Sequence, residues 1–314
     1  MQNQSERIEE QVFSEEHIEQ LVPLYTNAFG MRSSAEYLHQ KFFASYQSTR
    51  ASAIAFNQKG LAVSFYGIIR QKARFNNKEF SIGQSCDSMT HSEYGGRGLF
   101  IKLAEYAYEQ LQKQGLGFVY GFPNERIFGL RKNKLSWQFN KPINQYELKI
   151  KALPLAKLVK RFSSLRPIYL QLAKARLRRF ISPATHFENS VQAGNIAAVV
   201  HDADYFKYKH GPGKYILRLH GVHVWIKLDG CLWVGDFETC PADVFTNLLS
   251  ELKSLASALG CTSVRFHYHE GSPNDLLLKK VSSPVATMPC GFRALSPEFS
   301  GMEFHFCAAD FDTW

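Results

Sequence analysis

The sequence contains no Cys-x-x-Cys pair, no long tract of Pro, Gly or Ser, and no apolar run long enough to span a membrane. Six cysteines lie far apart along the chain: Cys86, Cys231, Cys240, Cys261, Cys290 and Cys307. This spacing argues against zinc and redox motifs, so we expect reduced thiols that are mostly packed. The missing low-complexity and apolar tracts argue against a disordered or membrane-spanning chain. We therefore expect a globular, cytoplasmic protein without a transmembrane segment.

Acidic residues are absent from one segment of the chain. No Asp or Glu lies between Glu147 and Glu188, and residues 151–179 within this interval carry nine cations: Lys151, Lys157, Lys160, Arg161, Arg166, Lys174, Arg176, Arg178 and Arg179. The formal net charge of +9 therefore comes from this segment. We expect a solvated, basic helical surface, because blocks of like charge are commonly only solubilising. The alternative is a site over residues 151–179 for an anionic acceptor, a lipid headgroup or RNA.

The length of 314 residues, with 45% apolar residues spread throughout, predicts two domains that each bury a core. In the first half, apolar spacing and turn residues predict helix, helix, three strands, helix, strand, helix and strand. The expected ranges, in that order, are 14–29, 34–45, 51–56, 61–70, 80–90, 98–115, 117–122, 124–135 and 137–150.

The second half repeats much of this order. Strands are expected at 196–200, 215–219, 222–228, 232–238 and 262–268, and helices at 204–209 and 242–259. We therefore predict an α/β (α+β) fold in which mixed, mostly antiparallel sheets are flanked by helices in two tandem domains. The expected division is a first domain over 1–150, a basic helical connector over 151–188 and a second domain over 189–314.

The most informative stretch joins the strand at 80–90 to the next helix, through Gly95-Gly96-Arg97-Gly98. Glycines let backbone N–H groups close around an anion and adopt left-handed dihedrals at little cost. The helix start adds unpaired N–H groups and a dipole worth up to about 2 kcal/mol towards a phosphate. The turn follows the third strand of a meander and lacks a Gly-Lys-Ser/Thr ending, which argues against Rossmann and P-loop folds. It predicts a pyrophosphate site of another kind.

Downstream of this turn the chain reads Phe118-Val119-Tyr120-Gly121-Phe122-Pro123-Asn124 and then Lys134-Leu135-Ser136-Trp137. The whole pattern resembles the GNAT acetyltransferases, and most of all the bacterial branch with a second, degenerate GNAT-like half. The resemblance covers residues 14–150 and extends to the second half only in layout. It implies the GNAT fold, acetyl-CoA as the acyl donor and an amine as the acceptor.

The resemblance also implies roles for individual residues. The pyrophosphate is expected at Gly95, Gly96, Arg97, Gly98, Leu99 and Phe100. Backbone groups for the pantetheine and the acetyl carbonyl are expected at Met89 and Thr90, with His91 beside them, and Asn124 is expected along the pantetheine arm. Substrate contacts are expected at Gln84, Ser85 and Tyr120.

Three departures from the family pattern affect catalysis more than cofactor binding. Gly95 stands where the family commonly has Gln or Arg, and Phe100 stands where a small residue is common. The helical Tyr that protonates the departing CoA thiolate has no counterpart, since Lys132 and Asn133 occupy its neighbourhood.

Asp87 is the candidate general base, because it lies on the strand that leads to the cofactor turn. Alternation in a strand places Ser85, Asp87 and Met89 on one face and Gln84, Cys86, Ser88 and Thr90 on the other. The equally weighted alternative is an Asp that satisfies neighbouring backbone or a buried hydroxyl. The base would then be His91, Glu93 or a residue of the second half.

The second half has no glycine cluster at the matching point, where Gly235-Asp236-Phe237-Glu238 runs into Thr239-Cys240-Pro241-Ala242. We expect this half to bind no CoA and to complete the acceptor pocket. Asp236 and Glu238 are expected to be solvated strand-end acids, with acceptor-site carboxylates as the alternative. His267, His269 and Glu270 lack an evident further ligand, so no metal site is expected.

The expected reaction is direct transfer of an acetyl group to a weakly basic amine, because acid and base are poorly defined. Resemblance to acetyltransferases of surface-polysaccharide pathways favours an amino sugar or a related small molecule, while a protein or peptide amine stays open. Two alternatives belong to other classes. One is a tRNA-dependent aminoacyl transferase with paired GNAT-like halves, and the other is a non-catalytic module that binds CoA or a nucleotide.

Overall fold

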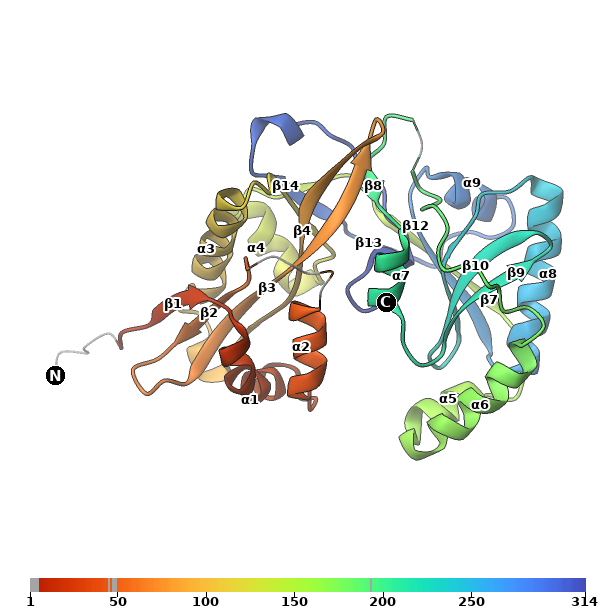
Figure 1. The fold of residues 1–314 in the computed structure, drawn as a ribbon, viewed down its shortest axis with the longest axis horizontal. Coiled ribbons are helices and arrows are strands. Elements are labelled where there is room, and N and C mark those ends of the chain that lie inside the picture. Colours follow the sequence, from red (N-terminus) through yellow and green to blue (C-terminus); the bar gives the residue numbers. More distant parts are fainter. Residues whose placement is uncertain (1–5, 45, 47–49, 193) are drawn as a thin grey trace. The chain divides into compact units, whose positions relative to one another are not determined.

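The computed structural model describes residues 6–44, 46, 50–192 and 194–314, and these form two compact units (Figure 1). The first unit holds the described residues up to Ala73 together with Glu79–Asn140 and Pro289–Met302. The second holds Arg74–Lys78, Lys141–Met288 and Glu303–Trp314. Each unit is built around its own sheet, as the predicted fold class requires.

The first unit contains helices, short 3-10 helices and one sheet. Its helical elements are η1 (Glu15–His17), α1 (Ile18–Phe29), α2 (Ala35–Phe43), η2 (Ser92–Tyr94), α3 (Leu99–Lys113), α4 (Glu125–Lys134) and η4 (Pro297–Phe299). Its strands are β1 (Glu9–Val12), β2 (Ala53–Phe56), β3 (Ala62–Phe75), β4 (Lys78–Thr90), β5 (Phe118–Gly121), β6 (Gln138–Phe139) and β14 (Gly291–Ala294).

The sheet of the first unit has the order β1-β2-β3-β4-β5-β14-β6. Asn76 and Asn77 both have positive φ, 48° and 61°, which is the two-residue turn geometry that suits the twist of the β3–β4 hairpin. The apolar face of α3 covers the sheet and is fully buried at Leu103, Ala104 and Leu111. This packing fixes where the N-terminus of α3 lies relative to the end of β4.

The second unit repeats these layers. Its helical elements are α5 (Leu155–Arg161), η3 (Ser163–Leu165), α6 (Arg166–Leu177), α7 (Ala203–Lys209), α8 (Ala242–Ala258), α9 (Pro273–Lys279) and η5 (Ala308–Asp310). Its strands are β7 (Ile143–Lys149), β8 (Ala198–Val199), β9 (Lys214–Leu219), β10 (Val222–Leu228), β11 (Leu232–Phe237), β12 (Ser263–His269) and β13 (Ala286–Met288).

The sheet of the second unit has the order β13-β7-β12-β11-β10-β9. Read from β9, this order corresponds to that of the first sheet from β2 to β6. In both sheets an antiparallel meander is followed by one parallel strand, β5 beside β4 and β12 beside β11. The next strand in each sheet comes from the other half of the sequence. β14 pairs with β5, from Gly291↔Gly121 to Ala294↔Phe118, and β7 pairs with β12 from Ser263↔Lys149 to His269↔Ile143. The tandem arrangement therefore includes a reciprocal exchange of strands.

This exchange departs from the linear division expected at residue 150. The predicted strand at 137–150 is two strands, β6 and β7, which belong to different sheets. β1, α9, β13 and β14 were not predicted, since each is short and three of them are edge or inserted strands stabilised by distant partners. The other expected elements are present within a few residues of their predicted ends.

Two further expectations concern cysteines and membranes. All six cysteines are free and five are buried, with Cys240 half-buried, as expected for packed thiols. Within the described part of the chain, no helix has both the length and the apolar character needed to cross a membrane.

Candidate functional site

The candidate site begins where β4 separates from β5. Their parallel pairing covers only Gly83↔Val119 and Gln84↔Tyr120, whereas β4 continues to Thr90. Asp87 interrupts the extended backbone of β4 with a φ of 41°, in the left-handed region that non-glycine residues seldom adopt. Such local distortions occur preferentially at functional sites, where they redirect backbone groups. The last residues of β4 thus lie past the paired segment, beside the turn that leads to α3.

The glycine-rich turn presents a helix N-terminus without any blocking side chain. Gly96 and Gly98 have φ of 76° and 75°, and Gly98 is the N-cap of α3. The helical ladder begins with the amides of Ile101 and Lys102, which both donate to the carbonyl of Gly98 at 3.1 Å. The amides of Leu99 and Phe100 therefore precede the ladder, as the first N–H groups of any helix do.

The space beside the glycines of this turn is open. A Cβ added at Gly96 or Gly98 would meet no protein atom within 4 Å, so their glycine requirement comes from φ and not from crowding. The first turn of α3 contains no acidic residue that would repel an anion. Arg97 is 49% exposed in its side chain, stacks over the Tyr94 ring at 4.5 Å and forms an ion pair with Glu6 at 3.4 Å. The turn therefore has the backbone geometry expected of a diphosphate site.

The other residues expected to contact CoA lie around the end of β4. Met89 is buried, and its carbonyl accepts a hydrogen bond from Ser64 Oγ at 3.1 Å. The Thr90 hydroxyl lies 2.9 Å from that of Ser64, and the amide of His91 donates to the carbonyl of Val63 at 2.8 Å. Hydrogen bonds to β3 thus fix the position of this strand end.

Asn124 lies at the start of α4, three residues after the end of β5. It is exposed, and its side chain accepts a hydrogen bond from the amide of Ile127 at 3.1 Å as the N-cap of α4. Its structural function as a cap is therefore clear. Its contact with the pantetheine arm stays a prediction.

Asp87 is not a solvent-facing carboxylate. Its Oδ2 lies 2.6 Å from Nζ of Lys41, which α2 contributes, and the two side chains are 12% and 5% exposed. The positive φ also ends the simple alternation expected along β4, so Asp87 does not continue the face of Ser85. Both alternatives from the sequence, a base and a structural carboxylate, are compatible with this pair. The sequence offered no signal for Lys41, because it lies some forty-six positions before Asp87.

The residues expected to contact substrate are buried at the point where β4 and β5 are still paired. Gln84 and Tyr120 are fully buried, and Gln84 accepts a hydrogen bond from Gln71 at 3.0 Å. Ser85 accepts a hydrogen bond at 2.7 Å from Arg131 of α4, a buried guanidinium that also lies 4.2 Å from the centre of the Trp137 ring. Arg131 was missed because helix α4 has little amphipathic pattern to mark its inward face.

The α1–α2 connection forms a cavity of about 530 Å³ lined by Tyr25, Met31, Arg32, Ser33, Ser34 and Tyr37. Two contacts tie this connection to the end of β4. Asn27 accepts a hydrogen bond from the amide of Ser92 at 2.9 Å, and Lys41 pairs with Asp87. The cavity therefore belongs to the same unit and the same sheet end as the glycine-rich turn.

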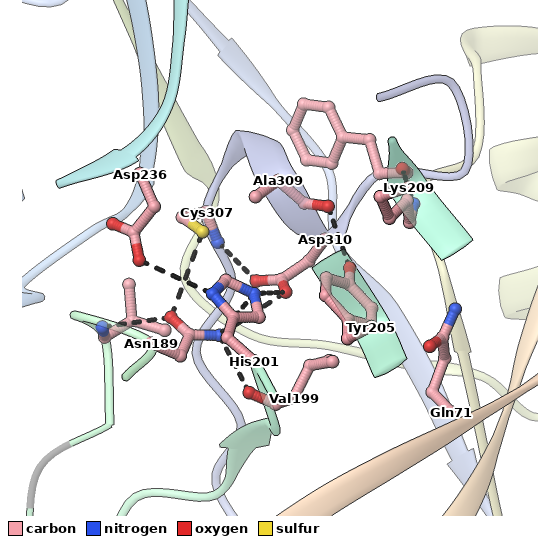
Figure 2. A network of polar contacts seen from close by, with 12 residues as sticks. Gln71, Asn189, Val199, His201, Tyr205, Lys209, Asp236, Cys307, Ala309 and Asp310 are labelled. Carbon is pink, nitrogen blue, oxygen red and sulfur yellow. Dashed lines mark hydrogen bonds and ion pairs between the residues drawn. The ribbon is translucent and has the colours of Figure 1, made fainter. Parts of the chain in front are cut away.

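The second unit has an interior polar network at the matching position of its sheet (Figure 2). Asp236 of β11 is fully buried, and it accepts hydrogen bonds from the amide of Ser190 at 2.9 Å and from Tyr268 Oη at 3.1 Å. His201 lies between two carboxylates, with Nε2 2.9 Å from Asp310 and Nδ1 3.7 Å from Asp236. Burial raises the pKa of Asp236 to about 6. The expectation of a solvated strand-end acid is therefore wrong for Asp236, because strand pairing alone does not show which side of a sheet is covered.

One part of this network has the side chains of a metal site. Ligand atoms of His201, Cys307 and Asp310 all lie within 4.8 Å of one another. They are already partnered, however, since Asp310 accepts hydrogen bonds from the backbone amide of Cys307 at 2.8 Å and contacts His201. Burial also raises the pKa of the Cys307 thiol far above its usual value, which disfavours the thiolate that a metal needs. The arrangement fits an internal hydrogen-bond network.

The histidines of β12 are packed as neutral rings. His267 stacks on Trp233 with centroids 5.2 Å apart, and His269 stacks on His305 at 4.4 Å. Burial lowers the pKa of His267 to about 4 and that of His269 to about 3. These contacts are those of core side chains. Glu238, at the end of β11, pairs with His223 at 3.0 Å and is partly exposed.

Comparisons with known proteins agree with this geometry. The family model of the acetyltransferase (GNAT) domain matches residues 11–132. A GCN5-related N-acetyltransferase from Kribbella flavida has a TM-score of 0.63 over 95% of this chain and 74% of its own, at 12% identity. Another from Anabaena variabilis ATCC 29413 has a TM-score of 0.59 over 92% and 73%, at 13% identity. No curated protein matches the sequence. The likeness to solved structures thus extends the shared fold through both units.

Proposed function

Since this chain carries a GNAT acetyltransferase domain and is an N-acetyltransferase of that superfamily, we propose that it transfers the acetyl group of acetyl-CoA directly to a small amine acceptor, an amino sugar or a related molecule. The observation that carries the proposal is the open helix N-terminus at Gly96-Arg97-Gly98, placed directly after the distorted end of β4.

The turn is proposed to hold the diphosphate of acetyl-CoA. Hydrogen bonds from backbone N–H groups to charged oxygens contribute about 1.5–3 kcal/mol each, and the helix dipole adds up to about 2 kcal/mol. Gly95, Leu99 and Phe100 complete this cradle through their backbones, and Arg97 offers a further positive charge at its rim.

The thioester is proposed to lie along the last residues of β4. Beyond Gln84 this strand has lost its pairing with β5. Backbone groups near Met89 and Thr90 are proposed to face the gap that results. An N–H group there would polarise the thioester carbonyl, as oxyanion-hole donors do. Asn124, at the start of α4, is proposed to border the pantetheine arm. Gln84, Ser85 and Tyr120 are proposed to line the end of the gap where β4 and β5 are still paired.

Asp87 is proposed to accept the proton that the acceptor loses. As the amine nitrogen bonds to the acetyl carbon, the carbon–sulfur bond breaks and the electron pair leaves with the CoA sulfur. The proton on nitrogen then passes to Asp87, directly or through one water. Lys41 positions the carboxylate at 2.6 Å, and His91 or Glu93 takes this function if Asp87 does not.

A weakly basic amine suits such a site. An amine with a pKa of about 10.4 must lose a proton at neutral pH at a cost of about 4.6 kcal/mol, whereas one with a pKa of about 7.7–8.0 costs only about 1 kcal/mol. The cavity at the α1–α2 connection supplies aromatic rings, hydroxyls and the guanidinium of Arg32, which match a hydroxylated ring. These two features support an amino sugar over a lysine side chain.

The experiment that tests the proposed function is an acceptor screen that follows release of free CoA thiol. Amino sugars, nucleotide-linked amino sugars and polyamines are supplied with acetyl-CoA, and mass spectrometry identifies the product. We expect acetyl transfer to an amino sugar and weaker transfer to polyamines. Tight binding of CoA without thiol release from any amine would instead indicate a binding module.

A further inference from the structure

Helices α5 and α6 of the second unit form a helical hairpin (Figure 1). The two helices expose an unusual amount of apolar surface. Fifteen large hydrophobic side chains are exposed among the described residues, and seven of them lie within residues 153–172: Leu153, Leu155, Leu158, Phe162, Leu165, Ile168 and Leu172. Their exposed fractions range from 44% to 75%. Single exposed apolar residues are normal, but a concentration of this kind indicates a surface that is covered by something else.

The exposed residues follow a helical repeat. Leu155, Leu158 and Phe162 are spaced i, i+3 and i+7, and Leu165, Ile168 and Leu172 repeat that spacing on the next helix. Each set therefore forms one stripe along its helix. We call the surface formed by these six residues of the α5–α6 hairpin the apolar stripe.

The opposite sides of both helices are already packed on the second unit. Ala156, Ala173 and Leu177 are buried, and the Tyr169 hydroxyl donates to the carbonyl of Leu259 at 3.0 Å. The amide of Ala156 donates to the carbonyl of Gly260 at 3.1 Å. The inner faces thus hold the hairpin in place, and the apolar stripe is a second, outward hydrophobic face.

The charges beside this stripe are all of one sign. Residues 151–179 carry nine cations and no carboxylate. Among the described residues, Lys160 is the one cation of this set in an ion pair, with Asp229 at 3.0 Å. The remaining cations are therefore available to an anionic partner.

Three kinds of partner can be weighed against this surface. RNA would use the cations, but it stacks on aromatic rings, and the stripe has Phe162 as its one aromatic residue. A second copy would bring nine further cations opposite the first nine, without hairpin carboxylates to offset them. An anionic lipid surface matches both features, because aliphatic side chains enter the acyl boundary while Lys and Arg contact headgroups.

We propose that residues 151–179 form an interfacial anchor that lies on an anionic membrane, with the apolar stripe inserted at the headgroup–acyl boundary. The proposal is independent of the acyl-transfer reaction, since none of these residues belongs to the first unit. The sequence led us to expect a solvated, basic helical surface over these residues. The proposal instead assigns this surface one partner, an anionic membrane.

Binding of the full chain to vesicles tests this proposal. We expect co-sedimentation with phosphatidylcholine vesicles that contain phosphatidylglycerol, little with phosphatidylcholine alone, and weakening by salt. Ile168→Asp should lower partitioning at least about tenfold, because it places a charge in the apolar stripe. Lys157→Gln should lower it about fivefold, since one surface cation contributes about a factor of five.

Val285→Asp is the matched control. Val285 is 60% exposed, as Ile168 is, and lies in the same unit near β13, so this variant should bind vesicles as the wild type does. If Lys157→Gln weakens vesicle binding but Ile168→Asp does not, the apolar stripe is not inserted in the membrane. That outcome would overturn the proposal in favour of a charge-only site for polyanions such as RNA. If the wild type is a dimer that does not bind vesicles, and Ile168→Asp converts it to a monomer, the membrane proposal is overturned in favour of self-association.

Discussion

The two units contain a strand, a turn and a helix in the same order, but the residues at the helix N-terminus differ. In the first unit, α3 follows Gly98, and its first turn contains no acid. In the second unit, α8 follows Pro241, and Asp243 lies in its first turn. Both helices have the same kind of dipole. The anion site proposed at α3 therefore depends on the glycine N-cap and on the absence of an acid in the first turn, and not on the helix dipole alone.

The region beside the parallel strand differs as well. Pairing of β4 with β5 ends at Gln84↔Tyr120, and pairing of β11 with β12 ends at Val234↔Phe266. In the second unit, however, the Tyr268 hydroxyl of β12 donates a hydrogen bond to Asp236 of β11 beyond that point. A Cβ added at Gly235 would overlap with the Trp314 ring, so the C-terminal residue packs tightly on β11. In the second unit, side chains occupy the place that the first unit is proposed to use for the thioester.

Removing the exchanged strand is expected to have the largest effect. A chain that ends at residue 150 lacks β14, which pairs with both β5 and β6 and whose Phe292 stacks on Phe118 at 5.4 Å. The first unit should then fail to fold, because an inner strand of its sheet is missing. Circular dichroism and limited proteolysis check this. A stable, active fragment would show that the two units are less interdependent than the strand order indicates.

Gly98→Glu is expected to lower acetyl-CoA affinity by about 10³-fold or more, since a carboxylate would stand where backbone N–H groups meet the diphosphate. Gly115→Glu is the matched control. Gly115 also has a φ of 75°, and an added Cβ there also meets no atom within 4 Å, but it lies past the other end of α3. Calorimetry should show normal affinity for this control. Equal affinities in both folded variants would place the cofactor elsewhere.

Asp87→Asn is expected to lower turnover by about 10²-fold, with acetyl-CoA affinity nearly unchanged and the acidic limb of the pH–rate profile lost. The matching change in the second unit, Asp236→Asn, alters a fully buried network instead. It should lower the free energy of unfolding and leave the acidic limb in place. A folded Asp87→Asn enzyme with near-normal turnover and an unchanged acidic limb would pass the function to His91, Glu93 or the second half.

The smallest expected effect concerns the pH dependence of stability. The folded pKa of His267 is about 4, below its usual value near 6.5, so the neutral ring stabilises the fold above pH 6.5 and that stability is lost as pH falls towards 4. The loss from this one residue should be about 3 kcal/mol. Asp236 changes stability with pH in the opposite direction. Its folded pKa is raised to about 6, so its contribution to the stability of the fold is largest at low pH, where the carboxyl is protonated, and is lost as pH rises.

Comparison of the wild type with His267→Asn isolates the histidine, since the contribution of Asp236 is common to both. Urea unfolding at a series of pH values should show a flatter dependence between pH 6.5 and 4 for the variant. An identical slope would mean that His267 is not held neutral. No strand of the first unit carries a comparable buried histidine pair among its described residues, so the effect should be a property of the second unit.

The sequence by itself determined the local parts of this protein. Helical spacing of Leu99, Leu103 and Leu111, the turn residues Asn76 and Asn77, and the glycines before α3 each act over a few residues, and the structure contains them where they were expected. The repeat of element order likewise predicted two copies of one fold. The glycine-rich turn before α3 could be predicted for the same reason, because backbone dihedrals and a helix start are local properties.

Tertiary structure alone decided the contacts between distant residues. The exchange of β7 and β14, the pairing of Lys41 with Asp87 and the burial of Asp236 depend on which surfaces meet, and a single sequence does not encode that in any short pattern. The basic hairpin is a further case. Its apolar residues read as ordinary helix positions in the sequence, and their exposure became evident only when the inner faces of α5 and α6 were seen to be packed on the second unit.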